Sequence, residues 1–413
     1  MKFSCLWMFI FAAPGLWAAD YVVIVSVDGL RPQAVEELGP NSTPNFHRLM
    51  NEGVYTHNAR TDYDWTWTVP NHTCMVTARP TVGVGGHNYT SNENPAISDN
   101  YHTNKGSYIT SMYDVAHDRG MTTGLFVAKN KLVIIDQSYN AAHGAPDITG
   151  VDNGRDKIDQ YVHNGDLTSD EITSVFTQAM TLSPMNLAML HVRDPDTQGH
   201  GDRWETAAYS NAVVAVDGYI GSVLSLLEGT PPFVNNSTVI VTSDHGGAGL
   251  FHEDETDYGN YRIPFYVWGY DVSEPGDLYS INFYSRQEPG LSRPRYDQVV
   301  PPIRNGDVAN LALMLLGLPP VPDQGAIINQ QQDLKVSLQA DHVGPLIICQ
   351  KMSGRGLELF WGHVPQPQRY TLQGRMTFEG FWNNVSGAVT TRRPYHVIPF
   401  DQVRGYYRVA LTP

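Results

Sequence analysis

Six acidic and histidine side chains lie shortly after apolar stretches of the sequence. They are Asp28, Asp196, His200, Asp244, His245 and His252. Apolar, β-branched runs such as YVVIVSV (21–27) and STVIVT (237–242) are typical of strands buried on both faces of a sheet. Functional groups of α/β sheets gather at the carboxyl ends of such strands. We therefore expect the six side chains to converge on one site.

Asp and His in this combination indicate bound metal ions. Carboxylate oxygen and neutral imidazole nitrogen suit Zn²⁺, with manganese or iron as alternatives. Six ligands are too many for one zinc ion with an open position and enough for two ions that share a site. Two ions roughly 3.5–4 Å apart suit an in-line displacement at phosphorus. The two ions would also neutralise an anionic substrate. Without them, the net charge of −15, from 27 Lys and Arg against 42 Asp and Glu, would repel it.

Such a reaction also needs a nucleophile. The segment DWTWTVPNHT (64–73) offers hydroxyls at Thr66, Thr68 and Thr73. A threonine hydroxyl is a weak nucleophile until a metal ion lowers its pKa, and exposed N–H groups at a helix start favour phosphate. The structural alternative for Thr68 is a helix N-cap, with Pro70 in the first turn.

At this segment the sequence resembles the nucleotide pyrophosphatase/phosphodiesterases of the alkaline phosphatase superfamily. The motif TVPNH (68–72) is similar to the nucleophile motif of that family. VSVDGLRP, PDTQGH, and SDHGG followed by a histidine and then IPFYVWG also match in order and spacing. The resemblance covers roughly residues 20–320 and is specific because the motifs occur together.

The resemblance implies an alkaline phosphatase-like α/β sandwich and a role for each residue. One ion would be held by Asp28, Thr68, Asp244 and His245, and the other by Asp196, His200 and His252. Thr68 would be the nucleophile, and Asn71 would donate a hydrogen bond to a phosphoryl oxygen. The implied cofactors are two divalent metal ions, above all Zn²⁺. The implied reaction is hydrolysis of a phosphodiester or nucleotide-like small molecule through a phosphothreonine intermediate.

The last histidine ligand has two candidates. Many family members take it from far downstream, where His363 is the candidate, but we favour His252.

The same TVPNH motif distinguishes this chain from other hydrolases of the superfamily. Sulfatases need Cys or Ser at the first position of a Cys/Ser-x-Pro-x-Arg motif and Arg at the last. Here Thr68 and His72 occupy these positions, so we reject a sulfatase. Phosphomonoesterases usually add a phosphate-gripping Arg, whereas Asn71 tolerates a substituent on phosphorus, which favours diesters. A phosphomonoesterase or a phosphonate-cleaving hydrolase remains the alternative.

Five further polar residues near these motifs have a structural interpretation. We expect His72 and His87 to pack in the interior, and Asp217 to be a capping or packing carboxylate. Lys129 and Lys131 lie near the end of a predicted strand; contact with the substrate is one interpretation, and we favour the solvated surface for both.

The elements that must position these residues alternate along the chain. Strands are predicted at 21–27, 123–128, 186–192, 237–242 and 263–268, and helices from Thr43-Pro44, near 108–117, from 169, at 206–227 and at 307–318. This alternation predicts an α/β fold, with a mostly parallel central sheet flanked by helices. Thr43 is the expected N-cap of its helix.

The pattern changes near residue 340. Segments 357–361, 369–372 and 406–411 alternate like half-buried strands, with Gly, Pro and Asn between them. We predict a catalytic domain over 20–320, a linker over 321–340, and a small β-sandwich-like module over 341–413. The module resembles those attached to exported bacterial enzymes. A surface-binding protein that acts through this module is the alternative from another functional class.

The first 19 residues read as a secretory signal peptide, with Lys2, an apolar run and a small-residue cleavage site. We therefore expect a periplasmic or extracellular protein with no transmembrane segment after signal removal. Export would leave Cys74 and Cys349 free to pair. An acidic chain without a Lys/Arg run is not expected to bind nucleic acid. The oligomeric state is left open.

Overall fold

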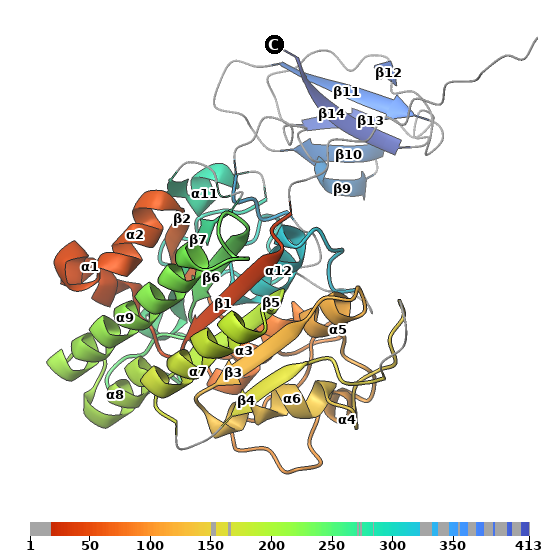
Figure 1. Ribbon diagram of the computed structural model, residues 1–413. Helices are drawn as coiled ribbons and strands as arrows, with labels where there is room; N and C mark the ends of the chain where they lie inside the picture. The colour runs from red at the N-terminus through yellow and green to blue at the C-terminus, as the bar shows by residue number, and fades with distance from the viewer. Residues whose placement is uncertain are drawn as a thin grey trace, which may run out of the picture.

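The computed structural model describes residues 18–149, 154–163, 167–270, 272, 275–283, 285–322 and 333–337, and beyond them the backbone of strands between 347 and 412. Its centre is an eight-stranded sheet in the order β4-β3-β5-β1-β6-β7-β2-β8 (Figure 1). The strands are β1 (Tyr21–Val27), β2 (Val54–Arg60), β3 (Thr123–Val127), β4 (Gln160–His163), β5 (Leu187–Val192), β6 (Ser237–Thr242), β7 (Arg262–Gly269) and β8 (Gly276–Asp277). Strands β4, β3, β5, β1 and β6 are parallel, and β7 is antiparallel to both β6 and β2. The predicted mostly parallel sheet is confirmed.

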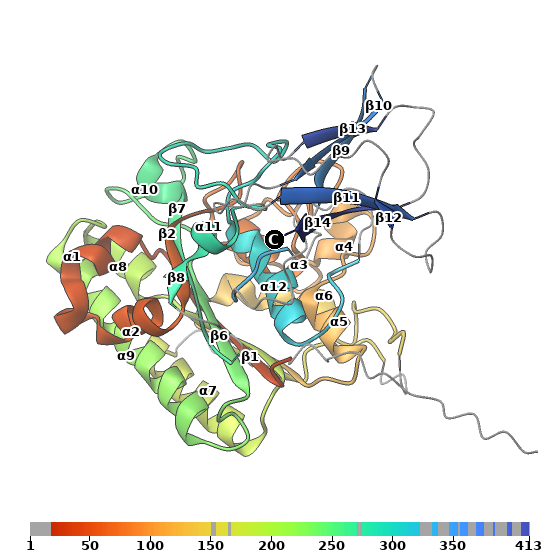
Figure 2. The same cartoon turned by 90° about the horizontal axis from the view of Figure 1, so that it is seen from above.

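Helices cover both faces of the sheet, as the view from above shows (Figure 2). One face carries α1 (Pro32–Ser42), α2 (Pro44–Glu52), α7 (Ser169–Leu182) and α9 (Ala207–Gly229), and the other carries α3 (Thr68–Thr77), α5 (Met112–His117), α6 (Val133–Tyr139) and α12 (Val308–Leu315). Short helices are α4 (Tyr101–Lys105), α8 (Asp194–Asp202), α10 (Tyr258–Tyr261), α11 (Leu278–Ile281), η1 (Asn130–Leu132) and η2 (Asn305–Asp307).

The apolar run of β1 supplies two hydrophobic cores. Successive side chains of a strand point to opposite faces, so Ile24 packs into one core while Val23 and Val25 pack into the other. This explains why the strand reads as a continuous apolar run rather than an alternating one.

Helix α9 is the one helix among the described residues that is long and apolar enough to cross a membrane. Its apolar stripe, which includes Val213, Val216, Ile220 and Val223, is buried in the core with Phe46 and Leu190. This burial makes α9 a core helix.

The start of α2 is capped by a residue distant in the sequence. Thr43 occupies the predicted N-cap position and Pro44 begins the helix, but the Thr43 side chain makes no capping hydrogen bond. The Asp217 carboxylate accepts hydrogen bonds from the backbone N–H groups of Asn45 at 3.2 Å and Phe46 at 2.8 Å. A carboxylate at this place satisfies open N–H groups and complements the helix dipole. The interpretation of Asp217 as a capping residue is confirmed.

The C-terminal strands form two three-stranded antiparallel sheets, β13-β10-β9 and β12-β11-β14. They are β9 (Ile347–Ser353), β10 (Gly356–Trp361), β11 (Arg369–Arg375), β12 (Asn383–Asn384), β13 (Tyr395–Ile398) and β14 (Tyr406–Thr412). The three predicted strands coincide with β10, β11 and β14. The domain boundaries stay a prediction. Residues 1–17, His363, the side chain of Cys349 and most of the 321–340 segment lie outside the described part.

Candidate metal centre and nucleophile

The carboxyl ends of four neighbouring parallel strands meet at one edge of the sheet. In the order β3-β5-β1-β6 they lead to Lys129, Asp196, Asp28 and Asp244. Asp28 follows β1 directly, Asp196 lies in the first turn of α8, and Asp244 is two residues beyond β6. Parallel pairing therefore converts residues far apart in the sequence into neighbours.

The first cluster surrounds the ring of His245. Its Nε2 lies 3.2 Å from Asp244 Oδ2, 3.4 Å from Thr68 Oγ1 and 3.5 Å from Asp28 Oδ1. Zinc–ligand bonds of about 2.0–2.1 Å in a tetrahedron place neighbouring ligand atoms about 3.3–3.4 Å apart. The three distances from His245 Nε2 to the other expected ligands of one ion are therefore close to the spacing within a zinc ligand set. Asp28 and His245 also lie close enough to Asp196 to hold an ion together with it.

The second cluster surrounds Asp196. Its Oδ1 lies 3.4 Å from His200 Nε2 and 3.7 Å from His252 Nε2, and these three side chains could hold one ion. The same oxygen is 3.9 Å from His245 Nε2, so the two clusters adjoin. The structure thus brings together all seven side chains expected to bind metal.

Three carboxylate oxygens of these clusters are buried without a hydrogen-bond partner. They are Asp28 Oδ1, Asp196 Oδ1 and Asp244 Oδ2. These same atoms face the histidine nitrogens described above. A buried, unsatisfied carboxylate oxygen is costly unless a cation or a donor compensates it. The residues present therefore fit a pair of divalent cations.

The three histidines are oriented for coordination through Nε2. The Nδ1–H groups of His245, His252 and His200 donate to the carbonyls of Gly246, Thr66 and Leu250, at 2.7–2.8 Å. Because a carbonyl can only accept, the ring proton is on Nδ1, which leaves the Nε2 lone pair free. Burial lowers the pKa of His245 to about 4 and of His252 to about 3, so both rings are neutral near pH 7.

The carboxylates respond differently to the same burial. Burial and the nearby Asp28 charge raise the pKa of Asp244 well above its usual value. Burial also acts to raise the pKa of Asp28, but the Lys129 ammonium and His191 outweigh it and hold this pKa well below its usual value. One ammonium group does not balance three buried carboxylates, which again favours added cations.

Two residues of this site were not expected from the sequence. Lys129 Nζ lies 2.8 Å from Asp28 Oδ2 and 2.6 Å from Asp196 Oδ2, so its assignment to the solvated surface is wrong. His191, inside β5, accepts a hydrogen bond from the N–H of Ala128 on Nδ1 and therefore donates from Nε2 to Asp28 Oδ2 at 3.0 Å. A lone histidine in the apolar run LAMLHV, and a lysine just after a buried strand, were the available signals.

Thr68 is the first residue of α3, and Trp67 occupies the N-cap position. The interpretation of Thr68 as the N-cap is therefore wrong. Its side chain is 1% exposed, and Oγ1 faces His245 Nε2. The loop before Thr68 contacts the second cluster through His252. Thr66 Oγ1 donates to the His252 carbonyl, and the His252 Nδ1–H donates to the Thr66 carbonyl.

Two asparagines near Thr68 have different surroundings. Asn71 is fully buried, its Nδ2 donates to the carbonyls of Trp65 and Trp67, and its Oδ1 accepts from the N–H of Asp62. Its expected contact with a phosphoryl oxygen stays a prediction, and both its donor hydrogens already have partners. Asn92, half-buried, uses Oδ1 to accept from the N–H of Val69, the residue after Thr68, at 3.0 Å.

The glycine of the SVDGL motif allows two strand ends to approach. Gly29 has φ +72°, and a Cβ atom there would lie 2.8 Å from Asp196 Cα. Its N–H donates to Asp244 Oδ1 at 3.1 Å. A side chain at Gly29 would therefore push apart the loops that carry two of the carboxylates.

His72 and His87 are buried structural residues, as expected. His72 contacts the Thr68 carbonyl through Nδ1 and Ser26 Oγ through Nε2, and His87 Nδ1 accepts from the N–H of Tyr89. Burial lowers the pKa of each to about 3.

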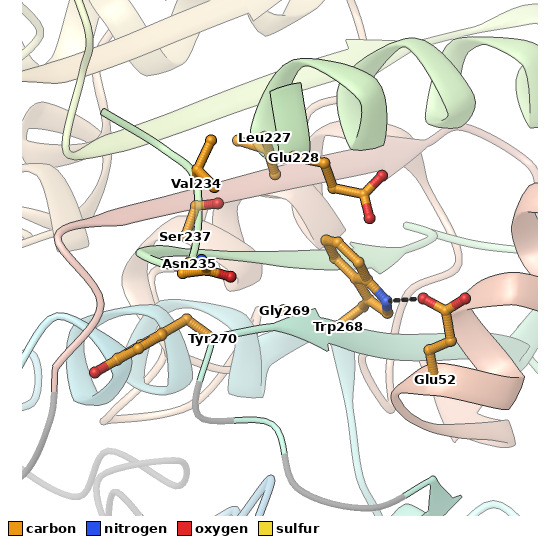
Figure 3. A pocket seen from close by; sticks show the side chains of 9 residues that line it. All are labelled: Glu52, Leu227, Glu228, Val234, Asn235, Ser237, Trp268, Gly269 and Tyr270. Atoms are coloured by element: carbon orange, nitrogen blue, oxygen red, sulfur yellow. Dashed lines mark hydrogen bonds between the residues drawn. The ribbon is translucent and has the colours of Figure 1, made fainter. Parts of the chain in front are cut away.

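Two other features are separate from this centre. His117, Asp118 and Asp147 lie close enough to hold a cation, but Lys157 Nζ already contacts Asp118 at 2.7 Å and also contacts Asp147. An open cavity of about 390 Å³ lies at the amino end of β6, opposite to the Asp244 end (Figure 3). In it Trp268 Nε1 donates to Glu52 at 3.0 Å. Neither feature adjoins Thr68.

Comparison with known proteins places these observations in a family. Residues 22–349 match the type I phosphodiesterase/nucleotide pyrophosphatase family. The chain belongs to this family. The human ectonucleotide pyrophosphatase/phosphodiesterase family member 5 is 23% identical over 229 residues, which are 54% of this chain and 44% of the human protein. The chain thus matches less than half the length of this relative.

Solved structures show the same fold. Murine ectonucleotide pyrophosphatase/phosphodiesterase 5, solved as an inactive threonine-to-alanine variant with AMP, superposes with a TM-score of 0.52 at 16% identity, covering 76% of this chain and 100% of the murine chain. A 2-O GAG sulfatase gives a TM-score of 0.51 at 13% identity, over 77% of this chain and 76% of the sulfatase. The expected alkaline phosphatase-like architecture is confirmed.

Proposed function

We propose that this protein is an exported, metal-dependent hydrolase of phosphoric esters that uses Thr68 as its nucleophile and acts on nucleotide-like small molecules. The observation that carries this proposal is the convergence of Thr68 Oγ1 with three unsatisfied carboxylate oxygens and three free histidine nitrogens. Family membership supports the same reaction class. The murine relative, whose inactive variant lacks a threonine and holds AMP, supports the choice of nucleophile and substrate class.

The chain's own residues have distinct tasks in this reaction. Thr68 Oγ1 attacks phosphorus in line and expels one alcohol, which forms a phosphothreonine that water then hydrolyses. The N–H groups at the start of α3 favour the negative phosphoryl group. Two divalent cations, Zn²⁺ above all, would neutralise the substrate and lower the pKa of the Thr68 hydroxyl and of the second-step water. Asp28, Thr68, Asp244 and His245 would hold one, and Asp196, His200 and His252 the other.

We assign the phosphoryl hydrogen bond to Asn92 instead of Asn71. The Asn71 amide already donates to the Trp65 and Trp67 carbonyls, whereas the Asn92 side chain contacts the backbone of Val69, next to Thr68 in the sequence, and its Nδ2 makes no hydrogen bond to another described residue. The preference for diesters over monoesters is unchanged by this reassignment, because Asn92, like Asn71, offers a neutral amide in place of an arginine clamp, and the family match supports it.

The covalent intermediate provides a direct test. We expect the metal-loaded protein, quenched in acid during turnover, to carry a covalent group on the peptide that contains Thr68. This group is a phosphoryl group when the substrate is p-nitrophenyl phosphate, and a p-nitrophenyl phosphoryl group when it is bis-p-nitrophenyl phosphate, because only one of the two alcohols has left. Mass spectrometry of the digested protein detects it. The Thr68→Ala variant is the control and should carry none. Turnover without phosphorylation of this peptide would contradict the proposed nucleophile.

A further inference from the structure

We propose that Trp204 is a positioning residue that holds His200 and His252 in place and thereby sets the affinity of the second cluster for its metal ion. This inference rests on the proposed function and adds a residue to its site. Trp204 lies two residues beyond α8, the helix that carries Asp196 and His200, and its side chain is buried in the core.

The indole of Trp204 contacts both histidine rings of the second cluster. Its centroid lies 5.1 Å from that of His200, at an interplanar angle of 76°, and 5.9 Å from that of His252, at 71°. This edge-to-face arrangement is favourable between aromatic rings. The Nδ1 hydrogen bonds of the two histidines, to the Leu250 and Thr66 carbonyls, fix their tautomers but leave each ring able to tilt. The indole restricts that tilt and so keeps both Nε2 atoms directed at the cluster.

Trp204 also packs against one glycine from each of the three ligand motifs. Its Nε1–H donates to the carbonyl of Gly29, the residue after Asp28, at 3.0 Å. A Cβ atom would lie 2.3 Å from the indole atom Cε2 at Gly199 and 2.0 Å from it at Gly247. Neither Gly199 nor Gly247 has a positive φ, so the indole, and not the backbone conformation, excludes a side chain there. One side chain therefore fills the space between the three loops that carry the metal ligands.

The second cluster depends on this support more than the first. The side chain of His200 is 39% exposed, so solvent covers part of it and protein packs against the rest. The side chains of Asp28, Asp244 and His245 in the first cluster are fully buried. Residues that orient a metal-binding histidine typically change metal affinity by about 10–100-fold. Loss of the indole should therefore weaken the binding of one of the two ions.

Zinc affinity, measured by competition with a chromophoric chelator, tests this role without reference to catalysis. For Trp204→Leu we expect the affinity for one Zn²⁺ ion to fall roughly 10–100-fold while the other ion stays bound. Trp204→Phe keeps an aromatic ring and should lose less affinity. Unchanged affinity in both variants would overturn the proposal.

Trp268→Leu is the matched control. This substitution also removes an indole that donates from Nε1, in the cavity at the opposite end of the sheet (Figure 3). It should leave the affinity for both ions at the wild-type value. A loss as large as that in Trp204→Leu would show that the effect does not come from contact with the histidines, which would contradict the proposal.

A second substitution tests the packing between the indole and the ligand loops. Gly199→Ala places a methyl group against the indole and should lower the affinity for the same ion. In the Trp204→Leu background the smaller side chain leaves room for this methyl group, so the further loss should be much smaller. Losses that simply add would show that the two positions act independently, against the proposed contact.

Stability and activity measurements separate this inference from its alternatives. A residue with a merely structural role would lower the thermal stability of the metal-free protein and leave the zinc affinity of the folded protein unchanged, and this result would overturn the positioning role. If the wild type binds two ions but does not hydrolyse bis-p-nitrophenyl phosphate, and Trp204→Leu has lost affinity for one ion, the hydrolase proposal is wrong and the role of Trp204 stands. If Trp204→Leu binds zinc as the wild type does, the role of Trp204 is wrong, whatever the rates. A wild type that binds no Zn²⁺ would contradict both.

Discussion

His245 Nε2 lies 3.4 Å from Thr68 Oγ1, although 177 positions separate the two residues in the sequence. The Thr68 hydroxyl is thereby placed among atoms that can hold a cation, and not simply at the start of a helix. In the proposed mechanism, a cation held by these atoms would lower the pKa of the Thr68 hydroxyl and activate this weak nucleophile.

Thr68→Ala should abolish turnover and leave metal binding largely intact. The substitution removes one oxygen from one cluster, while Asp28, Asp244 and His245 remain, and the other cluster is untouched. Elemental analysis of the purified variant should give a metal content near that of the wild type. Wild-type rates in this variant would show that another group attacks phosphorus.

Removal of metal should abolish activity and lower stability, and Zn²⁺ should restore both best. Three buried carboxylate oxygens lose their compensation when cations leave. A ligand at about 100 times its dissociation constant stabilises the folded state by about 2.7 kcal/mol. Thermal unfolding with and without chelator, alongside rate assays, measures both effects. Full activity in protein shown to be metal-free would refute the metal-dependent site.

Replacement of Asn71 should lower stability, whereas replacement of Asn92 should lower the catalytic rate. Asn71→Ala leaves the Trp65 and Trp67 carbonyls without their buried donor, so the free energy of unfolding should fall by about 1–3 kcal/mol. Asn92→Ala should keep its stability but lose roughly 10²–10³-fold in kcat, the usual cost of one lost oxyanion donor. Urea unfolding and initial rates on the two variants distinguish these outcomes. The reverse pattern would return the phosphoryl contact to Asn71.

Stability should decrease on acidification because of buried neutral histidines. Burial lowers the pKa of His87 to about 3, against about 6.5 in an unfolded chain. Between these values the unfolded chain binds a proton that the folded chain does not, so His87 costs up to about 1.4 kcal/mol of stability per pH unit as the pH falls below about 6.5. His87→Gln should show a shallower decrease in urea unfolding experiments between pH 6.5 and 5. Equal slopes for variant and wild type would contradict this account.

The sequence by itself determined the sheet and the residue types of the metal centre. Runs such as 21–27 and 237–242 are rich in β-branched residues and contain no charged residue, which is typical of a strand covered on both faces, and Asp28 and Asp244 follow those runs closely. Strand β2, VYTHNAR, was missed because His57 and Asn58 interrupt its apolar pattern. Parallel strands place their carboxyl ends together, so the convergence of the ligands could be predicted without knowing the strand order.

Only the tertiary structure decided which neighbouring residues join that centre. Lys129 differs little from a surface lysine in sequence, and its position between Asp28 and Asp196 follows from β3 lying beside β5 in the sheet. Thr43 is the N-cap residue of α2, but Asp217 supplies the capping hydrogen bond to the Phe46 N–H, because α9 packs against α2. Sequence patterns report burial and local conformation, whereas these partners are set by packing between elements that are distant in the chain.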